Sequence, residues 1–369
     1  MKRYFLGLAA RRRGACRQFF TRGRRRDAVD LEQTLIQRYG GERAVLAKNG
    51  RSALTLALKA YLEPRSGVIV NGFTCYAVVE AVKAAGMVPV YADIDRDTLN
   101  YNITTLRNAQ SQKQSATPVT VCAIIVQNTL GIPVDMKVVE GFSKKHHLVI
   151  IEDLAHCVGV KYPDGREVGT VGAAAVLSFG KDKAIDTVSG GAVVLRHPCK
   201  NVISAPSKLP KLSDYLRERW YPSFAAVTRW LTYVHLSGVW MRFLLAVHWV
   251  EKSADNRLDL VRRIPYFEAR LALRQLRNGV NGVDREFCLV RERAEVLEKL
   301  RKAGYYFSGF WYEKPVSPAR YYRKVHFPEG ECPVATEVAE KIINLPTYYT
   351  KAELAAARKI IDQYREDAK

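Results

Sequence analysis

Three polar residues that could take part in chemistry lie at or just after the ends of short apolar runs. Asp153 follows the run 148–151, Ser178 lies at the end of the run 173–179, and Lys183 comes shortly afterwards. Short apolar runs bounded by turn residues are typical of buried strands in a parallel sheet. The carboxyl ends of such strands meet at one edge of the sheet, where ligands bind. We therefore expect Asp153, Ser178 and Lys183 to lie together at that edge.

These three side chains match the needs of one cofactor, pyridoxal phosphate. The cofactor requires an amine for a Schiff base, a carboxylate for its ring nitrogen and hydrogen-bond donors for its phosphate. The alternative is that Asp153 caps a helix and that Lys183 is one solvated lysine among many. Because several roles are filled together, we favour the cofactor site.

The segment around these residues resembles the DegT/DnrJ/StrS sugar aminotransferases, which depend on pyridoxal phosphate and have fold type I. The family shares the patterns Glu-Asp-x-Ala-(Gln or His), Ser-Phe-x-x-x-Lys and Gly-Gly-Ala. The matching residues are Glu152, Asp153, Ala155, His156, Ser178, Phe179, Lys183, Gly190, Gly191 and Ala192. The resemblance implies three catalytic residues. Lys183 would form the Schiff base, Asp153 would keep the ring nitrogen protonated, and His156 would form a hydrogen bond with the phenolic oxygen. Lys181 is the nearest competitor for the Schiff base, but its spacing from Ser178 fits the family less well.

A second cofactor-binding segment is expected at 47–54, where a glycine turn enters a helix. The amino end of a helix offers free N–H groups and a positive dipole end, which suit a phosphate. The family uses this position for the cofactor phosphate, so Gly50, Arg51 and Ser52 are predicted to hold it together with Ser178. Arg51 stands where the family has threonine.

The face of the cofactor ring is predicted to be covered from the segment 73–77, which resembles the family pattern Phe-Thr-aromatic-x-Ala. Cys75 occupies the position of the aromatic residue, and Tyr76 follows it. Either residue is a candidate for this role, and Tyr76 is preferred because flat rings stack well on aromatic faces. The alternative is that Tyr76 belongs to the ordinary core.

The elements that position these residues alternate along the chain. Strands are expected at 68–70, 88–92 and 119–126, with helices at 55–61, 77–85 and 135–146, the last capped by Asp135. This alternation predicts an α/β fold with a mostly parallel, doubly wound sheet. The predicted parts are a basic tail (1–27), a large pyridoxal-phosphate-binding domain (28–200), a divergent, apolar, tryptophan-rich helical insertion (201–265) and a smaller C-terminal α/β domain (266–369).

The insertion departs from the family, and the family's substrate-gripping Asn-x-Arg loop is not found there. The stretch 223–250 carries only Arg229 and Arg242 as fixed charges, and Gly238 could divide it into two helices. Four of the five tryptophans lie nearby, at Trp220, Trp230, Trp240 and Trp249. Arg242 near the middle argues against a membrane span. Two interpretations remain, a helical pair at a membrane interface and a buried pair covering the active site or a dimer interface.

Composition and charge indicate the number of domains, the cellular compartment and the kinds of binding partner. The chain has 369 residues and 48% hydrophobic content, which favours two domains over one. Its seven cysteines are scattered without a Cys-x-x-Cys motif, which indicates a reducing compartment and neither a disulfide framework nor a metal site. The net charge is +21, and residues 1–26 contain ten Lys and Arg side chains and no acidic one. This segment is interpreted as an anchor for anionic lipid, with a targeting peptide or a solvated tail as alternatives. Nucleic-acid binding would rest on charge alone and is not expected.

The resemblance implies a transaminase that moves an amino group, from glutamate as in the family, to a keto sugar on a nucleotide or lipid carrier. Such an enzyme would serve the biosynthesis of amino sugars or surface polysaccharides, as a homodimer with the active site at its interface. Family members that dehydrate their substrate carry histidine where Lys183 stands, so Lys183 favours amination. We expect a cytoplasmic enzyme that contacts the inner face of a membrane. The competing hypothesis is a catalytically inactive scaffold with the same fold, held at the membrane.

Overall fold

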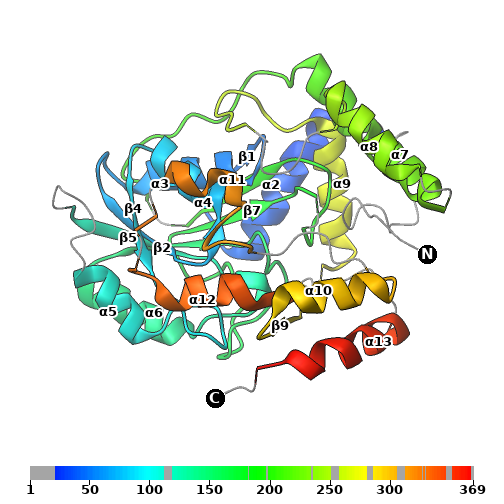
Figure 1. Cartoon of the computed structure of the whole chain (residues 1–369). Coiled ribbons are helices and arrows are strands. Elements are labelled where there is room, and N and C mark those ends of the chain that lie inside the picture. Colours follow the sequence, from blue (N-terminus) through cyan, green and yellow to red (C-terminus); the bar gives the residue numbers. More distant parts are fainter. Residues whose placement is uncertain are drawn as a thin grey trace.

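The computed structural model describes residues 21–111, 119–181, 183–196, 198–233, 236–250, 257–280, 286–305, 312–325, 327–328, 330–345 and 351–366. At its centre is a seven-stranded sheet (Figure 1). From one edge to the other, its strands are β1 (Arg43–Ala47), β8 (Gly191–Leu195), β7 (Ala174–Ser178), β6 (Val149–Asp153), β5 (Val121–Val126), β2 (Gly67–Asn71) and β4 (Val88–Ala92). The strands β7, β6, β5, β2 and β4 pair in parallel, and β8 runs antiparallel to both β7 and β1. The predicted α/β architecture with a mostly parallel sheet is confirmed.

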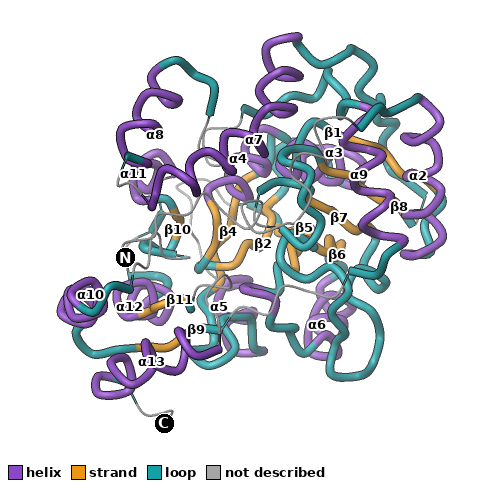
Figure 2. The backbone as a smooth tube through the Cα atoms, turned by 90° about the vertical axis from the view of Figure 1, so that its right-hand side faces the viewer, coloured by secondary structure: helices purple, strands orange, loops and turns teal. Residues whose placement is uncertain are grey.

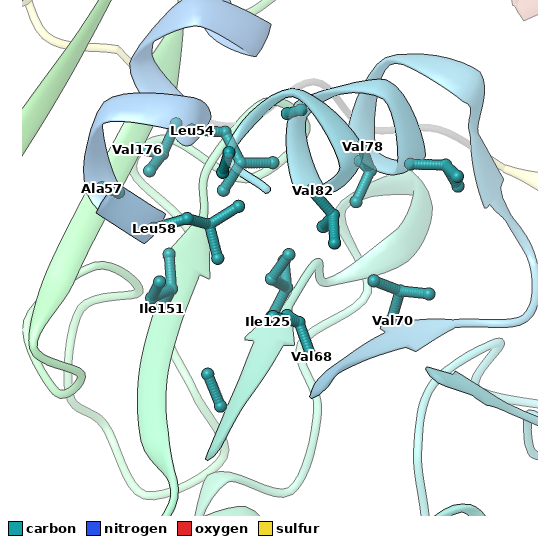
Figure 3. Packing of buried hydrophobic residues seen from close by; sticks show 14 of the residues in the cluster. Leu54, Ala57, Leu58, Val68, Val70, Val78, Val82, Ile125, Ile151 and Val176 are labelled. Atoms are coloured by element: carbon teal, nitrogen blue, oxygen red, sulfur yellow. The ribbon is translucent and has the colours of Figure 1, made fainter. Parts of the chain in front are cut away.

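Helices cover both faces of the sheet, because neighbouring strand residues point to opposite sides. On one face, Leu58 of α3 (Gly50–Tyr61) and Val82 of α4 (Tyr76–Ala84) pack over Val70 and Ile125 (Figure 3). On the other face, the helices α2 (Arg25–Tyr39), α5 (Ile103–Ser111), α6 (Met136–His146) and α9 (Tyr266–Arg277) join a second cluster. Strands buried on both sides explain why their sequences are continuous apolar runs.

The start of helix α6 agrees with the sequence prediction. Asp135 precedes α6, and its side chain accepts a hydrogen bond from the N–H of Lys137 at 3.1 Å. The predicted N-cap is therefore present. The edge strand β1 was not among the predicted strands.

The C-terminal part forms a cluster of its own. The strand β9 (Phe287–Leu289) pairs antiparallel with β11 (Ile342–Asn344), and α10 (Arg293–Lys302) and α13 (Lys351–Ile361) pack around them. Together with α12 (Pro333–Lys341), these elements lie below the central sheet in Figures 1 and 2. The domain boundaries stay predictions, but α9, which we placed in the C-terminal domain, packs against α2 within the second cluster of the sheet.

The insertion folds as a helical hairpin of α7 (Leu212–Tyr233) and α8 (Ser237–Ala246), which lies at the edge of the molecule in Figure 1. The break between the helices precedes Ser237, so Gly238 lies in the first turn of α8 and does not itself divide them. Among the described residues, no helix is both long enough and apolar enough to cross a bilayer.

Candidate active site

Asp153 and Ser178 end the adjacent parallel strands β6 and β7, and Lys183 follows in the segment that leads to β8. The Asp153 carboxylate is buried, and its Oδ1 accepts the N–H of Ala155 at 2.9 Å. Burial raises the pKa of Asp153, while this N–H and the positive charge of Lys183 act in the opposite direction. The roles predicted for Asp153 and Lys183 at a cofactor stay predictions.

The ring of His156 is oriented by the loop after β5. Its Nδ1 accepts the backbone N–H of Leu130 at 3.2 Å, so a ring proton resides on Nε2. Leu130 and Asn128 both have a positive φ, at 56° and 50°. Such backbone conformations in residues other than glycine concentrate at functional sites. Asn128 is held there by the N–H of Val134, which donates to its Oδ1 at 2.9 Å.

The amino end of α3 lies directly against Ser178. A Cβ on Gly50 would fall 2.7 Å from the Cβ of Ser178, so only glycine permits this approach. Asn49 caps the helix, because its Oδ1 accepts both the N–H and the hydroxyl of Ser52, each at 2.9 Å. The structure thus joins two predicted phosphate-binding segments that lie far apart in the sequence.

Two of the predicted phosphate ligands direct their side chains to other parts of the protein. Arg51 forms an ion pair with Glu80 of α4. The hydroxyl of Ser52 donates to Asn49 and accepts the N–H of Asp259 at 3.0 Å. If Arg51 and Ser52 hold a phosphate, the backbone N–H groups of the helix end do so.

The candidates for covering the cofactor ring, Cys75 and Tyr76, lie where β3 (Thr74–Cys75) enters α4. The ring of Tyr76 stacks on Tyr321 of α11 (Ala319–Tyr322), with centroids 4.3 Å apart and planes 13° apart. Tyr76 is half-buried and packs against the first hydrophobic cluster. A role of either residue at the ring stays a prediction.

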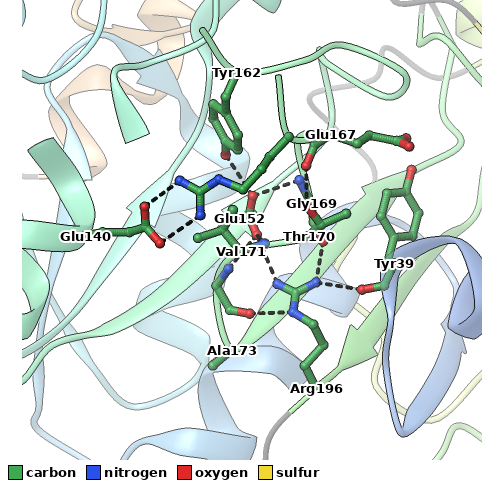
Figure 4. Close-up of polar contacts among 12 residues, drawn as sticks. Tyr39, Glu140, Glu152, Tyr162, Glu167, Gly169, Thr170, Val171, Ala173 and Arg196 are labelled. Atoms are coloured by element: carbon green, nitrogen blue, oxygen red, sulfur yellow. Dashed lines mark hydrogen bonds and ion pairs between the residues drawn. The ribbon is translucent and has the colours of Figure 1, made fainter. Parts of the chain in front are cut away.

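Glu152, the acidic neighbour of Asp153, is fully buried within a network of polar contacts (Figure 4). It accepts hydrogen bonds from Tyr162, the N–H groups of Gly169, Val171 and Gly172, and Arg196, at 2.6 to 2.9 Å. A carboxylate with this many donors is satisfied without a ligand. Glu152 therefore fixes the end of β6 rather than taking part in the reaction.

Sequence reasoning missed the two residues of α9 that hold the segment after Lys183. Gln275 accepts the N–H of Asp186 at 3.0 Å and donates to its carbonyl at 2.9 Å. Glu268, which is fully buried, accepts the hydroxyl of Ser189 at 2.9 Å. Positions 268 and 275 are two helical turns apart and share a face. Polar residues at this spacing, next to the apolar positions of an amphipathic helix, were the available signal.

The α7–α8 hairpin also contacts the segment between β7 and β8, which contains Lys183. The ammonium group of Lys181 lies 3.9 Å from the ring centroid of Tyr221 on α7. Val188, whose φ is 80°, packs against Tyr221 and Leu244. The choice of Lys183 over Lys181 for the Schiff base stays a prediction.

Comparison with known proteins gives consistent matches. Residues 11–202 match the sequence model of the DegT/DnrJ/EryC1/StrS aminotransferase family. A UDP-N-acetyl-3-dehydro-alpha-D-glucosamine 3-aminotransferase of Acidithiobacillus ferrooxidans is 27% identical over 89% of this chain and 85% of its own length. A GDP-perosamine synthase of Escherichia coli O157:H7 is 34% identical over 41% of this chain and 40% of its own length. The solved structure of E. coli GDP-4-keto-6-deoxy-D-mannose-3-dehydratase with hydrated pyridoxal phosphate has a TM-score of 0.64 at 15% identity, covering 98% of this chain and all of that one.

Proposed function

The chain belongs to the DegT/DnrJ/EryC1/StrS aminotransferase family, and on this premise we propose that it transfers an amino group from glutamate to a keto sugar, using pyridoxal phosphate. The observation that carries the proposal is that β6 and β7 end side by side at Asp153 and Ser178, with Gly50 of α3 directly against Ser178. The fold alone does not decide the reaction, because a dehydratase shares it. Lys183 favours amination, and nothing in the comparisons supports the inactive scaffold.

The residues present fit the cofactor. The closeness of Gly50 to Ser178 leaves the N–H groups of the α3 terminus beside a hydroxyl, which suits a phosphate. Asp153 is a buried carboxylate available for a protonated ring nitrogen, and His156 presents a donor nitrogen. When bound, pyridoxal phosphate supplies an electron-accepting ring that stabilises negative charge beside the transferred nitrogen.

Each side chain at this edge of the sheet has a separate role in the proposed reaction. The amine of Lys183 holds the cofactor, and once the donor displaces it, its Nζ takes a proton from the Cα of glutamate and returns one to the sugar carbon that receives the nitrogen. The Asp153 carboxylate keeps the proton on the ring nitrogen. Nε2 of His156 donates to the phenolic oxygen, while Gly50, Arg51, Ser52 and Ser178 hold the phosphate.

The carrier of the sugar is proposed from the relatives. The two relatives described above are named for sugars carried on UDP or GDP. We therefore propose a nucleotide-linked keto sugar as the acceptor, within amino-sugar or surface-polysaccharide biosynthesis. A lipid-linked acceptor is the alternative.

We also propose a homodimer with the active site at its interface, as in the family, and peripheral contact with the inner face of a membrane. The basic segment 1–26 and the tryptophan-rich hairpin support the membrane contact. Two modest anchoring signals together give stable attachment where one does not.

The assignment of Lys183 is tested by borohydride treatment of the purified protein with pyridoxal phosphate. Peptide mass mapping should find the cofactor fixed to Lys183, and Lys183→Ala should abolish this product while Lys181→Ala retains it. Labelling at Lys181, or full turnover by Lys183→Ala, would contradict the assignment.

A further inference from the structure

The outer side of the α7–α8 hairpin is an apolar face. On α7 it consists of Leu216, Trp220, Val227 and Trp230, and along α8 of Val239 and Phe243 with the flanking residues Leu236 and Val247. The spacings are three, four or seven residues, which place each set on one side of its helix. Trp230 is 66% exposed, Val239 60% and Phe243 54%. Isolated exposed apolar residues are ordinary, but a continuous face marks a surface that binds something.

The opposite side of the hairpin already has a partner within the protein. Tyr221 and Leu244 are buried against Val188, next to the segment that carries Lys183. Glu218 of α7 forms an ion pair with Lys48, at the end of β1. The apolar stripes of both helices therefore face away from the protein.

Positive charge lies beside the hairpin, where the exposed residues Arg22, Arg24, Arg25 and Arg26 follow Thr21. The described chain begins beside the hairpin, where Arg219 of α7 donates to the carbonyl of Thr21 at 3.1 Å and Arg270 of α9 donates to that of Arg22 at 2.7 Å. The residues that precede Thr21 include basic side chains and no acidic ones. They are Lys2, Arg3, Arg11, Arg12, Arg13 and Arg17. Arg242 is exposed on α8 itself. The partner of this face must therefore accept apolar side chains and positive charge together.

An anionic membrane offers both, because tryptophan suits the headgroup level and arginine suits acidic lipids. A second copy of the chain fits less well, since a self-complementary interface here would bring two basic segments together. We propose that the outer face of the α7–α8 hairpin docks on an anionic membrane surface, which rests on the membrane contact proposed above and assigns it to this face. The active-site segment with Lys183 then lies about one helix diameter, ~10 Å, beneath the docking plane.

Flotation of the full-length holoenzyme with vesicles tests the proposal. The vesicles contain phosphatidylglycerol with phosphatidylcholine, or phosphatidylcholine alone. The test variant carries Trp230→Ser, Val239→Ser and Phe243→Ser, all at exposed positions. The matched control carries Val29→Ser and Val202→Ser, exposed apolar residues outside the hairpin. We expect the wild type and the control to float with anionic vesicles, and the partition of the triple variant to fall by about tenfold or more.

Each outcome bears on a different claim. If the wild type floats and the triple variant floats equally, the membrane contact stands but this face does not make it. If the wild type stays in the soluble fraction at low salt, the docking face is refuted, while transfer to soluble keto sugars still tests the enzymatic proposal separately. If the triple variant floats as the wild type does but has a lower molecular mass in analytical ultracentrifugation, the face joins two copies of the chain and the proposal is overturned.

Discussion

Asp153, at the buried end of β6, is the residue proposed to bind the protonated ring nitrogen of the cofactor. Its carboxylate is enclosed by protein, and burial raises its pKa, which the N–H of Ala155 and the charge of Lys183 offset. An asparagine has almost the same shape but cannot keep a proton on the cofactor ring nitrogen. We predict that Asp153→Asn still binds pyridoxal phosphate but loses about a hundredfold or more in kcat. Cofactor content and steady-state rates measure the two effects, and an unchanged kcat would refute the role.

Gln275 is predicted to position the Lys183 segment without touching the cofactor. Its side chain bonds to both the N–H and the carbonyl of Asp186. Gln275→Leu keeps the bulk but loses both bonds, so kcat should fall about tenfold to a hundredfold with little change in KM. Borohydride labelling of Lys183 should slow in parallel, which a general loss of stability would not produce.

The matched control for this prediction is Arg274→Ala, at the exposed neighbouring position of α9. It should leave both the rate and the labelling unchanged. If Gln275→Leu reduced only thermal stability, with normal kcat and labelling in the folded protein, Gln275 would not be a positioning residue.

At this scale the sequence predicted which strands end beside one another but not where every side chain points. Asp153 and Ser178 could be placed because the adjacent parallel strands β6 and β7 end at one edge of the sheet, and the role of Lys183 stays a prediction. The directions of Arg51, Ser52 and Tyr76 depend on partners that are distant in sequence. These partners are Glu80, Asp259 and Tyr321. Local pattern contains no information on such pairs.

The amino end of α3 links helix stability to cofactor binding. Asn49 caps the helix and also donates to the carbonyl of Arg257 at 2.9 Å. We predict that Asn49→Ala lowers the free energy of unfolding by about 1 kcal/mol and weakens the binding of pyridoxal phosphate. Urea unfolding and cofactor titration measure the two quantities.

Asn49→Asp separates these two effects. Aspartate caps a helix as well as asparagine does, but its charge lies beside the proposed phosphate position. This variant should keep the helix cap while losing the hydrogen bond to the carbonyl of Arg257, and it should still lose affinity for the cofactor. Equal cofactor affinity in the wild type and both variants would exclude a phosphate at this helix end.

The α9–α7 contact contains a buried acid whose charge state should affect stability. Burial, followed by the negative charge of Glu218, raises the pKa of Glu268 well above its ordinary value near 4.5. The folded state then holds the proton more tightly than the unfolded state. Its contribution to stability is fully present below pH 4.5 and is lost as the pH rises towards the raised pKa, at up to about 1.4 kcal/mol per pH unit.

Glu268→Gln should remove this pH dependence, because the amide can still accept the hydroxyl of Ser189 and does not ionise. We predict that the stability of the wild type relative to Glu268→Gln falls as the pH rises above 4.5. Urea unfolding between mildly acidic and neutral pH measures the difference. Parallel stability curves would show that Glu268 does not titrate in this range.

Elements with a strong local pattern were predictable, and those defined by tertiary packing were not. Continuous apolar runs identified β2, β4, β5, β6, β7 and β8, because strands covered on both faces need no polar alternation. The edge strand β1 carries a similar short apolar run at 44–47, and we did not assign it as a strand. The assignment of α9 to the C-terminal domain missed its packing against α2, since an amphipathic helix does not specify which sheet it covers.

For the whole molecule, charge and fold point to different aspects of function. The net charge of +21 bears on which ligands and surfaces the protein attracts, and not on a particular reaction. The fold is shared by aminotransferases and by a dehydratase, so it narrows the chemistry without fixing it. We propose that the residues at the sheet edge, and Lys183 above all, decide the reaction.

The most direct test follows the nitrogen atom. The holoenzyme is incubated with nitrogen-15-labelled glutamate and a panel of keto sugars on UDP, GDP or lipid carriers, and the products are analysed by mass spectrometry. We predict that a nucleotide-linked sugar acquires the labelled nitrogen, that 2-oxoglutarate forms in equal amount, and that Lys183→Ala forms neither. Loss of the label to ammonia without an amino sugar, or equal transfer by Lys183→Ala, would contradict the assignment of this chain as a Lys183-dependent sugar aminotransferase.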